Sequence, residues 1–132
     1  MLDLTKTSAI VTGGASGLGA AVAAYLAGRG AKVCLFDMNS DVATTTAAKI
    51  GATWQQVDVS NTESVRQAFE KARAVQGQEQ ILVNCAGIGP ASKTVSRGEP
   101  HNPAMFAKVI GVNLLGSFYC ASTAASGMVS SK

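Results

Sequence analysis

Short apolar runs bounded by turn-forming residues recur at regular intervals along the chain. They lie at residues 8–12 (SAIVT), 32–37 (KVCLFD), 53–59 (TWQQVDV) and 80–86 (QILVNCA). Runs of this length are too short for helices, and a continuous apolar run is typical of a strand that is buried on both faces of a parallel sheet. The pattern therefore predicts four parallel strands.

The segments between these runs have the period of amphipathic helices. The Gly-Arg-Gly of residues 28–30 and Gly51 predict the ends of the first two helices, and Ser60 with Glu63 predicts a capping box before the third. The side chains that we expect to face the core are Leu18, Val22, Tyr25 and Leu26 in the first helix, Val42, Thr46 and Ile50 in the second, and Val65, Ala68, Phe69, Ala72 and Val75 in the third.

Strands that alternate with helices form βαβ units joined by right-handed crossovers. After the fourth strand, a loop over 87–103 precedes a last helix from about Ala104 to about Ala125. The sequence therefore predicts an α/β fold, a Rossmann-like doubly wound parallel sheet of about four strands with flanking helices. No repeat or low-complexity tract divides residues 1–132, which we expect to form one domain.

Composition places the chain among globular proteins, since 47% of its residues are apolar and 14% are charged. The net charge of +3 comes from basic residues scattered along the chain, which argues against a nucleic-acid surface. The amino terminus does not have the pattern of a secretion signal, and we expect no apolar stretch long enough to span a bilayer. We therefore expect no membrane partner.

The cysteines indicate a reducing compartment. Cys34, Cys85 and Cys120 are far apart and odd in number, and Cys34 and Cys85 lie in apolar runs typical of buried thiols. The chain has no C-x-x-C pair and one histidine, so we expect no metal site. A cytoplasmic location follows as an expectation.

Residues 11–20 (VTGGASGLGA) place four glycines where the first strand becomes the first helix. Small residues there let the backbone approach a phosphate, which the free N–H groups of the helix terminus bind. A triphosphatase loop requires lysine and a hydroxyl after its last glycine, but Ala20 and Ala21 follow Gly19. The common dinucleotide fingerprint would have to start at Gly17 and reaches Val22 in place of a small residue.

What the chain contains is T-G-x-x-x-G-x-G, and this pattern resembles the short-chain dehydrogenase/reductase family. Residues 84–87 (NCAG) are similar to the family's N-N-A-G motif, with Cys85 in place of the second asparagine. Residues 58–59 (DV) and 111–118 (GVNLLGSF) are similar to two further motifs, in the same order. Within the family, the amino-acid sequence of these stretches is most similar to that of type II 3-hydroxyacyl-CoA dehydrogenases.

The resemblance implies hydride transfer between NAD and a secondary alcohol or ketone, with a 3-hydroxyacyl-CoA as a candidate substrate. It also implies a homo-oligomer, either a dimer or a tetramer, and a proton relay supported by Asn113, whose alternative role is that of a structural amide in a bent helix. The residues that we expect to bind the cofactor are Gly13, Ser16, Gly17, Leu18, Gly19, Asp37, Asp58, Val59, Asn84, Ala86 and Gly87.

Asp37 favours NAD over NADP. It ends the second strand 18 residues after Gly19 (37 − 19), near the spacing at which a carboxylate accepts hydrogen bonds from the adenosine ribose. An NADP site would place a basic residue nearby, but Met38, Asn39 and Ser16 occupy those positions. The alternative is a solvated aspartate that caps the next helix.

The family's catalytic tyrosine, with lysine four residues later, has no counterpart here. Arg29 follows Tyr25 at that spacing, and Thr123 follows Tyr119. We therefore expect residues 1–132 to be the amino-terminal part of a family member, truncated before the catalytic Ser and Tyr-x-x-x-Lys and inactive alone. A noncatalytic dinucleotide-binding module is the alternative. Sugar-nucleotide epimerase chemistry is less favoured, because proteins with that activity have the pattern T-G-x-x-G-x-x-G and Ser16 occupies the place of its second glycine.

Overall fold

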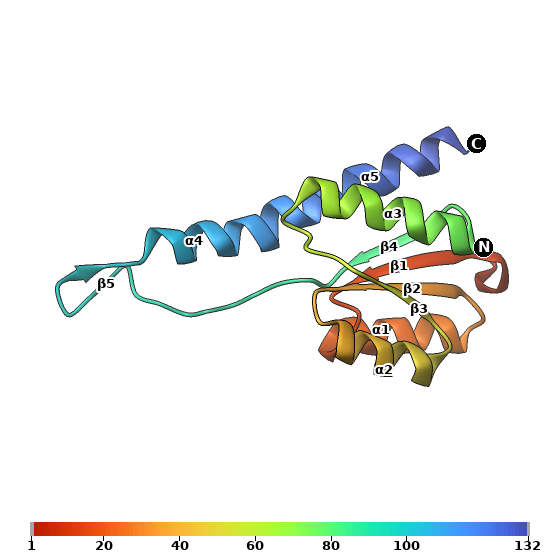
Figure 1. The fold of residues 1–132 in the computed structure, drawn as a ribbon, viewed down its shortest axis with the longest axis horizontal. Helices are drawn as coiled ribbons and strands as arrows, with labels where there is room; N and C mark the ends of the chain where they lie inside the picture. Colours follow the sequence, from red (N-terminus) through yellow and green to blue (C-terminus); the bar gives the residue numbers. More distant parts are fainter. Residues whose placement is uncertain (1, 132) are drawn as a thin grey trace.

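A parallel four-stranded sheet lies at the centre of the protein, for which a computed structural model describes residues 2–131 (Figure 1). The strands follow the order β3-β2-β1-β4. They comprise β1 (Ser8–Thr12), β2 (Lys32–Asp37), β3 (Thr53–Gln56) and β4 (Ile81–Asn84). The predicted α/β class, the parallel direction and the four strands are confirmed. The structure ends β3 and β4 earlier than predicted, because only their first residues pair with a neighbouring strand.

Helices cover both faces of the sheet, as a doubly wound fold requires. Figure 1 shows α1 (Gly17–Gly28) and α2 (Ser40–Ile50) on one face, and α3 (Thr62–Gln76) and α5 (Ser117–Ser130) on the other. A 3₁₀ turn, η1 (Leu4–Lys6), precedes β1. Helix α4 (Pro103–Ile110) continues through the π-helical segment η2 (Gly111–Gly116) into α5 without a break.

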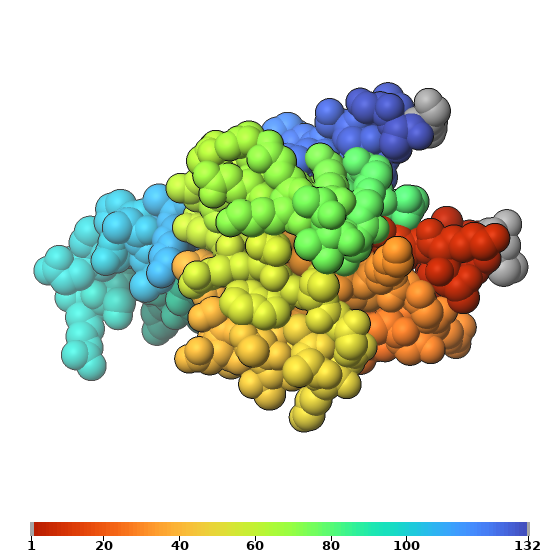
Figure 2. Space-filling model, turned by 45° about the vertical axis from the view of Figure 1, so that its right-hand side comes forward, coloured from red at the N-terminus to blue at the C-terminus, as the bar shows by residue number. Residues whose placement is uncertain are grey.

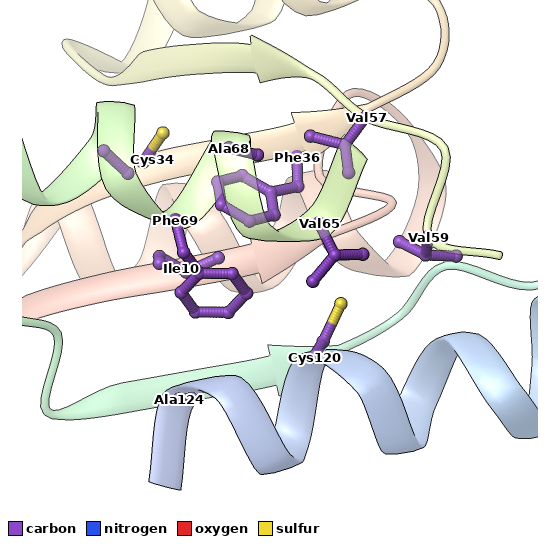
Figure 3. Close-up of a cluster of buried hydrophobic side chains, with 11 residues drawn as sticks. Ile10, Cys34, Phe36, Val57, Val59, Val65, Ala68, Phe69, Cys120 and Ala124 are labelled. Carbon is purple, nitrogen blue, oxygen red and sulfur yellow. The ribbon is translucent and has the colours of Figure 1, made fainter. Parts of the chain in front are cut away.

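Each face of the sheet has its own hydrophobic cluster. The cluster under α3 and α5 contains Phe36 and Phe69, whose rings meet edge to face at 5.1 Å between centroids. Figure 3 shows Cys120 of α5 turned toward this cluster, to which Ala124 of the same helix also belongs. The cluster under α1 and α2 is built mostly from valine, leucine and alanine. The fully buried aromatic rings Phe36 and Phe69 therefore lie on the face that α5 covers, while the half-buried Trp54 packs on the other face.

The predicted core face of α1 is wrong for two of its four residues. Leu18 is 82% exposed and Tyr25 is 58% exposed, whereas Gly19, Ala23 and Leu26 are buried. Both sets have helical spacing, but the small residues let the helix lie closer to the sheet. Tyr25 instead stacks under the guanidinium of Arg29, at 4.7 Å from the ring centroid.

The burial of small residues in place of large ones is repeated in α2. Ala43 and Ala47 are its buried residues, while Val42 is exposed and Thr46 and Ile50 are half-buried. In α3 the predicted residues from Val65 to Ala72 are buried, but Val75 at the end of the stripe is exposed. Helix spacing thus located the helices correctly but not always the side that is buried.

The start of α3 differs from the predicted capping box. Asn61 is the N-cap, and its side chain accepts a hydrogen bond from the N–H of Ser64. Glu63 is engaged by the guanidinium of Arg66 instead of reaching back to the cap. Ser60 donates its hydroxyl to Asp58 at 2.6 Å. Asn is as good a cap as Ser, so the neighbouring polar residue can occupy the position.

The loop predicted over 87–103 contains a small hairpin, β5 (Val95–Ser96) with β6 (Glu99–Pro100). Arg97 and Gly98 at its tip both have positive φ, as a tight two-residue hairpin turn requires. Figure 2 shows the hairpin and α4 projecting from one side of the body.

The continuous helix from Pro103 to Ser130 is longer than predicted. By length and composition alone it could cross a membrane, since its most apolar 18-residue window has a mean hydropathy of 1.4. The expectation that no apolar stretch is that long is therefore wrong. Its exposed apolar side chains are Met105, Phe106, Ile110, Leu114, Leu115, Phe118 and Val129.

The buried thiols of Cys34 and Cys120 make stability sensitive to alkaline pH. Burial raises the pKa of Cys34 from 9.0 to about 11 and that of Cys120 from 9.0 to about 12. Cys85, in contrast to its predicted burial, is only half-buried. A thiol whose pKa is raised by folding stabilises the native state below the unfolded pKa, and this contribution is lost as the pH rises through the folded value.

We expect the free energy of unfolding to fall between about pH 9 and pH 11, by up to about 1.4 kcal/mol per pH unit for each thiol. Urea unfolding across this range measures the slope. The double variant Cys34→Ala/Cys120→Ala, compared at each pH with the native sequence, should show a shallower slope. Equal slopes would contradict the assignment to these thiols.

Candidate functional site

A cleft of about 510 Å³ opens at the carboxyl ends of the strands. It lies where β1 and β4 are neighbours although they are far apart in the sequence, so that the crossovers on the two sides of β1 leave in opposite directions. Open α/β sheets bind ligands at this switch point. The predicted cofactor residues that line the cleft are Gly13, Ser16, Gly17, Leu18, Gly19, Asp37, Asp58, Val59, Ala86 and Gly87.

The glycine-rich turn after β1 is packed too closely for a Cβ at Gly13, Gly14 or Gly19. A Cβ on Gly13 would lie 2.8 Å from the backbone nitrogen of Ala86, and Gly13 has a φ of +62°. A Cβ on Gly19 would overlap the carbonyl oxygen of Gly13. The Gly13 N–H donates to the carbonyl of Phe36 at 2.8 Å, which ties the turn to β2. Glycine is therefore a steric requirement of this turn.

The amino terminus of α1 presents unpaired donors to the cleft. Ser16 is the N-cap, but its side chain makes no capping hydrogen bond. The first backbone hydrogen bond of the helix runs from the Ala20 N–H to the Ser16 carbonyl at 3.1 Å. The N–H groups of the first turn precede it and have no intrahelical partner. Together with the helix dipole, they suit an anion such as a phosphate.

Asp37 lines the cleft at the end of β2, and it also braces the turn. Its Oδ2 accepts a hydrogen bond from the N–H of Ala15 and its Oδ1 one from the N–H of Asn39, both at 3.0 Å. Each carboxylate oxygen keeps a free lone pair, since an ionised carboxylate accepts about four hydrogen bonds. The cap of the next helix is Asn39, so the predicted alternative of Asp37 as that cap is wrong.

Asp58 and Val59 form the wall of the cleft beyond β3. The Oδ1 of Asp58 accepts from both the N–H and the hydroxyl of Ser60, while its own N–H donates to the hydroxyl of Ser64 at 3.1 Å. Val59 packs closely against Gly116 in η2. The wall is thus held between α3 and the long helix.

Asn84 lies outside the cleft lining and supports the sheet instead. Its amide donates to the carbonyl of Ser117 at 3.2 Å, and its Oδ1 accepts from Thr12 at 3.5 Å. The hydroxyl oxygen of Thr12 accepts from the N–H groups of Cys85 and Ala86, both at 3.1 Å. These contacts join the ends of β1, β4 and the long helix.

Asn113 also lies outside the cleft lining, in the π-helical segment η2. Its Oδ1 accepts from the N–H of Ile88 and its Nδ2 donates to the carbonyl of Ile88, both at 2.8 Å. Both ends of the side-chain amide are therefore used to hold the start of the loop after β4. The structure brings Asn113 to the edge of the site through Ile88, which does line the cleft.

Sequence reasoning missed several lining residues, namely Phe36, Met38, Val57, Cys85, Ile88, Lys108 and Val112. Most of them directly flank predicted residues, so widening each motif by one position would have found them. Lys108 and Val112 are one helical turn apart, before Asn113. Among the cleft-lining residues that the structure describes, Lys108 is the one basic side chain, and the cleft also contains the carboxylates of Asp37 and Asp58.

The chain matches a family model described as short chain dehydrogenase over residues 7–132. It is 41% identical over 114 residues to a bovine 3-hydroxyacyl-CoA dehydrogenase type-2, covering 83% of this chain and 44% of that protein. It is 42% identical over 113 residues to a 2-dehydro-3-deoxy-L-rhamnonate dehydrogenase (NAD(+)) of Sphingomonas sp. (strain SKA58), covering 85% and 44%. The chain thus spans less than half of these relatives' length.

Solved structures share the fold. A short chain dehydrogenase/reductase family protein superposes with a TM-score of 0.83 at 32% identity, covering 98% of this chain and 52% of that one. A structure described as a ribose-5-phosphate isomerase from Brucella melitensis 16M also superposes with a TM-score of 0.83, at 33% identity and covering 92% and 46%. The different names on one fold show that activity has to be argued from the site.

The steric role of Gly19 can be tested against a glycine of the same helix. Gly19→Ala places a methyl group against the Gly13 carbonyl, so we expect a loss of roughly 1–3 kcal/mol in the free energy of unfolding. Gly28→Ala meets no atom within 4 Å and should be neutral or stabilise by up to about 1 kcal/mol. Urea unfolding measures both. Similar changes in the two variants would contradict the close approach.

Proposed function

The chain belongs to the short-chain dehydrogenase family, and on that premise we propose that it binds NAD in the cleft at the ends of β1 and β4. The proposed activity is the interconversion of a secondary alcohol and a ketone by hydride transfer. The observation that carries the proposal is the arrangement of the glycine-rich turn, the amino terminus of α1 and Asp37 around one cleft. When bound, NAD would supply the hydride acceptor.

The residues of the cleft fit the parts of a dinucleotide. The glycines of the turn and the first-turn N–H groups of α1 would hold the pyrophosphate. Asp58 and Val59 would flank the adenine, and Ala86 and Gly87 the second ribose. Leu18, which is 82% exposed beside the cleft, would cover the bound cofactor. This contact would remove its apolar side chain from water and so stabilise the complex.

Asp37 supports NAD in preference to NADP. Its carboxylate oxygens would accept hydrogen bonds from the adenosine ribose hydroxyls, whereas a 2′-phosphate would meet a like charge. Met38 and Asn39, the residues that follow, are uncharged. The Sphingomonas relative, whose name specifies NAD(+), supports the same cofactor.

The substrate that we propose is a 3-hydroxyacyl-CoA, because relatives of that name are about 40% identical to this chain. Hydride transfer from an alcohol needs a general base, and no Tyr-x-x-x-Lys occurs in the sequence. We propose that the catalytic Ser, Tyr and Lys are contributed from outside these 132 residues. Tyr25 cannot replace them, because it lies on the exposed side of α1.

Asn113 would support a proton relay through the main chain. Both polar atoms of its side chain are bonded to Ile88, and one lone pair on Oδ1 and one N–H on Nδ2 are left for water. Its contribution would be to hold the carbonyls of η2 and of the loop after β4 beside the cleft. This role combines the structural amide and the relay that the sequence left as alternatives.

We further propose that the protein acts in the cytoplasm as a homo-oligomer without a nucleic-acid partner, and that a second copy, not a membrane, covers the apolar side of its long helix. The long helix carries an exposed apolar side and β4 is an edge of the described sheet. Contiguous apolar surface of this kind is typical of a protein interface. A second copy covering the helix would give a dimer, from which a tetramer can be built.

A noncatalytic dinucleotide-binding module is the second candidate, favoured by the missing Tyr-x-x-x-Lys. Calorimetric titration with NAD and NADP tests the step that both candidates share, and saturable binding of NAD is expected. The native protein, isolated from its source, is then assayed for formation of reduced nicotinamide with 3-hydroxybutyryl-CoA. Turnover supports the dehydrogenase, binding without turnover supports the module, and no binding refutes both.

The role of Asp37 predicts a change in cofactor preference. Asp37→Ser with Met38→Arg removes the like charge and adds a cation, so the ratio of NADP to NAD affinity should rise at least about tenfold. Calorimetric titration of both cofactors measures the ratio. Asp41→Ser, at an exposed position in the first turn of α2, is the control and should leave it unchanged. An unchanged ratio in the double variant would contradict the assignment.

A further inference from the structure

Ala15 lies behind the glycine-rich turn, and side chains of two other elements bind both polar groups of its backbone. Its N–H donates to Oδ2 of Asp37 at 3.0 Å, and its carbonyl accepts from Oγ1 of Thr46 in α2 at 2.7 Å. Ala15 is 3% exposed, and neither Ala15 nor Thr46 lines the cleft. One residue of the turn is therefore held on both sides from outside the site.

The conformation of Ala15 determines where the following donors point. Ser16 and Gly17 come next, line the cleft and begin α1. Ser16 makes no side-chain capping bond, and Gly17 has a φ of +54° with no atom within 4 Å of the place where a Cβ would stand. The turn has little rigidity of its own here, since glycine is the least restricted residue. The contacts of Ala15 therefore restrain its orientation, in addition to the bond from the Gly13 N–H to Phe36.

Thr46 differs from its two threonine neighbours. The hydroxyls of Thr44 and Thr45 donate to carbonyls four residues earlier in α2, those of Ser40 and Asp41. Both neighbours are exposed, whereas Thr46 is half-buried and its hydroxyl reaches a carbonyl 31 residues away in sequence. The long-range bond is thus specific to one threonine of three.

We propose that Thr46 is a positioning residue for the phosphates of the dinucleotide. Its hydroxyl and the Asp37 carboxylate clamp Ala15, and the clamp keeps the N–H groups of the turn directed into the cleft before the ligand binds. A site ordered in advance loses less conformational entropy on binding. This inference rests on the proposed function. It also gives Asp37 a second task beside its ribose contact.

The test compares a phosphate-bearing ligand with one that lacks phosphate. The whole 132-residue chain and the variants Thr46→Val, Thr46→Ser and Thr45→Val are titrated with ADP and with adenosine, followed by backbone amide NMR. Valine keeps the shape of threonine and removes the hydroxyl, and serine restores it. Thr45→Val is the matched control, because its hydroxyl bonds within its own helix.

Thr46→Val should bind ADP roughly three- to tenfold more weakly, since one hydrogen bond to a buried carbonyl is lost. Its affinity for adenosine should be unchanged. Thr46→Ser and Thr45→Val should bind both ligands as the native sequence does. Native ADP affinity in Thr46→Val overturns the proposal. Equal weakening of ADP and adenosine also overturns it, because that result indicates a general loss of structure.

If the native sequence binds neither ligand, the proposed function fails. Hydrogen exchange of the Ala15 amide then tests separately whether Thr46 and Asp37 clamp Ala15. The clamp predicts exchange roughly threefold or more faster in Thr46→Val than in Thr45→Val, because the loosened turn opens more often. Equal exchange rates in the two variants overturn the clamp. If Thr46→Val also lowers the melting temperature, the same exchange measurement is made on Thr46→Ser. It shows whether the restored hydroxyl returns both the Ala15 exchange rate and the melting temperature to their native values.

Discussion

The close approach of the turn after β1 to the end of β4 is the constraint on which the rest of the site depends. A side chain at Gly13 would collide with the backbone of Ala86, and the hydroxyl of Thr12 accepts hydrogen bonds from the amides of Cys85 and Ala86. Segments more than 70 residues apart are thereby held in van der Waals contact. The cleft exists because these two strand ends meet while their following chains diverge.

Contacts from further out hold this junction in place. Asp37 and Thr46 fix Ala15 from the side of α2, and Asn84 ties β4 to the long helix. At the amino end of β4, away from the cleft, Arg73 of α3 pairs with the buried Glu79 and also donates to the carbonyl of Thr123 in α5. The guanidinium of Arg73 pairs the buried charge of Glu79, and removal of Arg73 would leave that carboxylate buried without a partner. The contacts of Asp37, Thr46 and Asn84 therefore connect the helices to the cleft, while the Arg73 pair joins α3 to α5 at the other end of the sheet.

The strands and their order of appearance could be predicted because continuous apolar runs have one stable placement, the interior of a parallel sheet. The buried sides of α1 and α2 could not, since Gly19, Ala23, Ala43 and Ala47 share the helical period with larger residues that stay outside. The resemblance of the chain's motifs to those of the family implied ten residues that the structure gathers around the cleft. It could not predict the bonds of Thr46 and Asn113, because those depend on partners 31 and 25 residues away. Their roles in binding stay predictions.

The central claim is that the cleft between the ends of β1 and β4 binds NAD through the glycine-rich turn and Asp37. A crystal structure of the protein grown with NAD tests it most directly. We expect the pyrophosphate to lie against the turn from Gly13 to Gly19, with the adenosine ribose bonded to Asp37. An ordered NAD molecule bound elsewhere, or a pyrophosphate away from the amino terminus of α1, would contradict the claim.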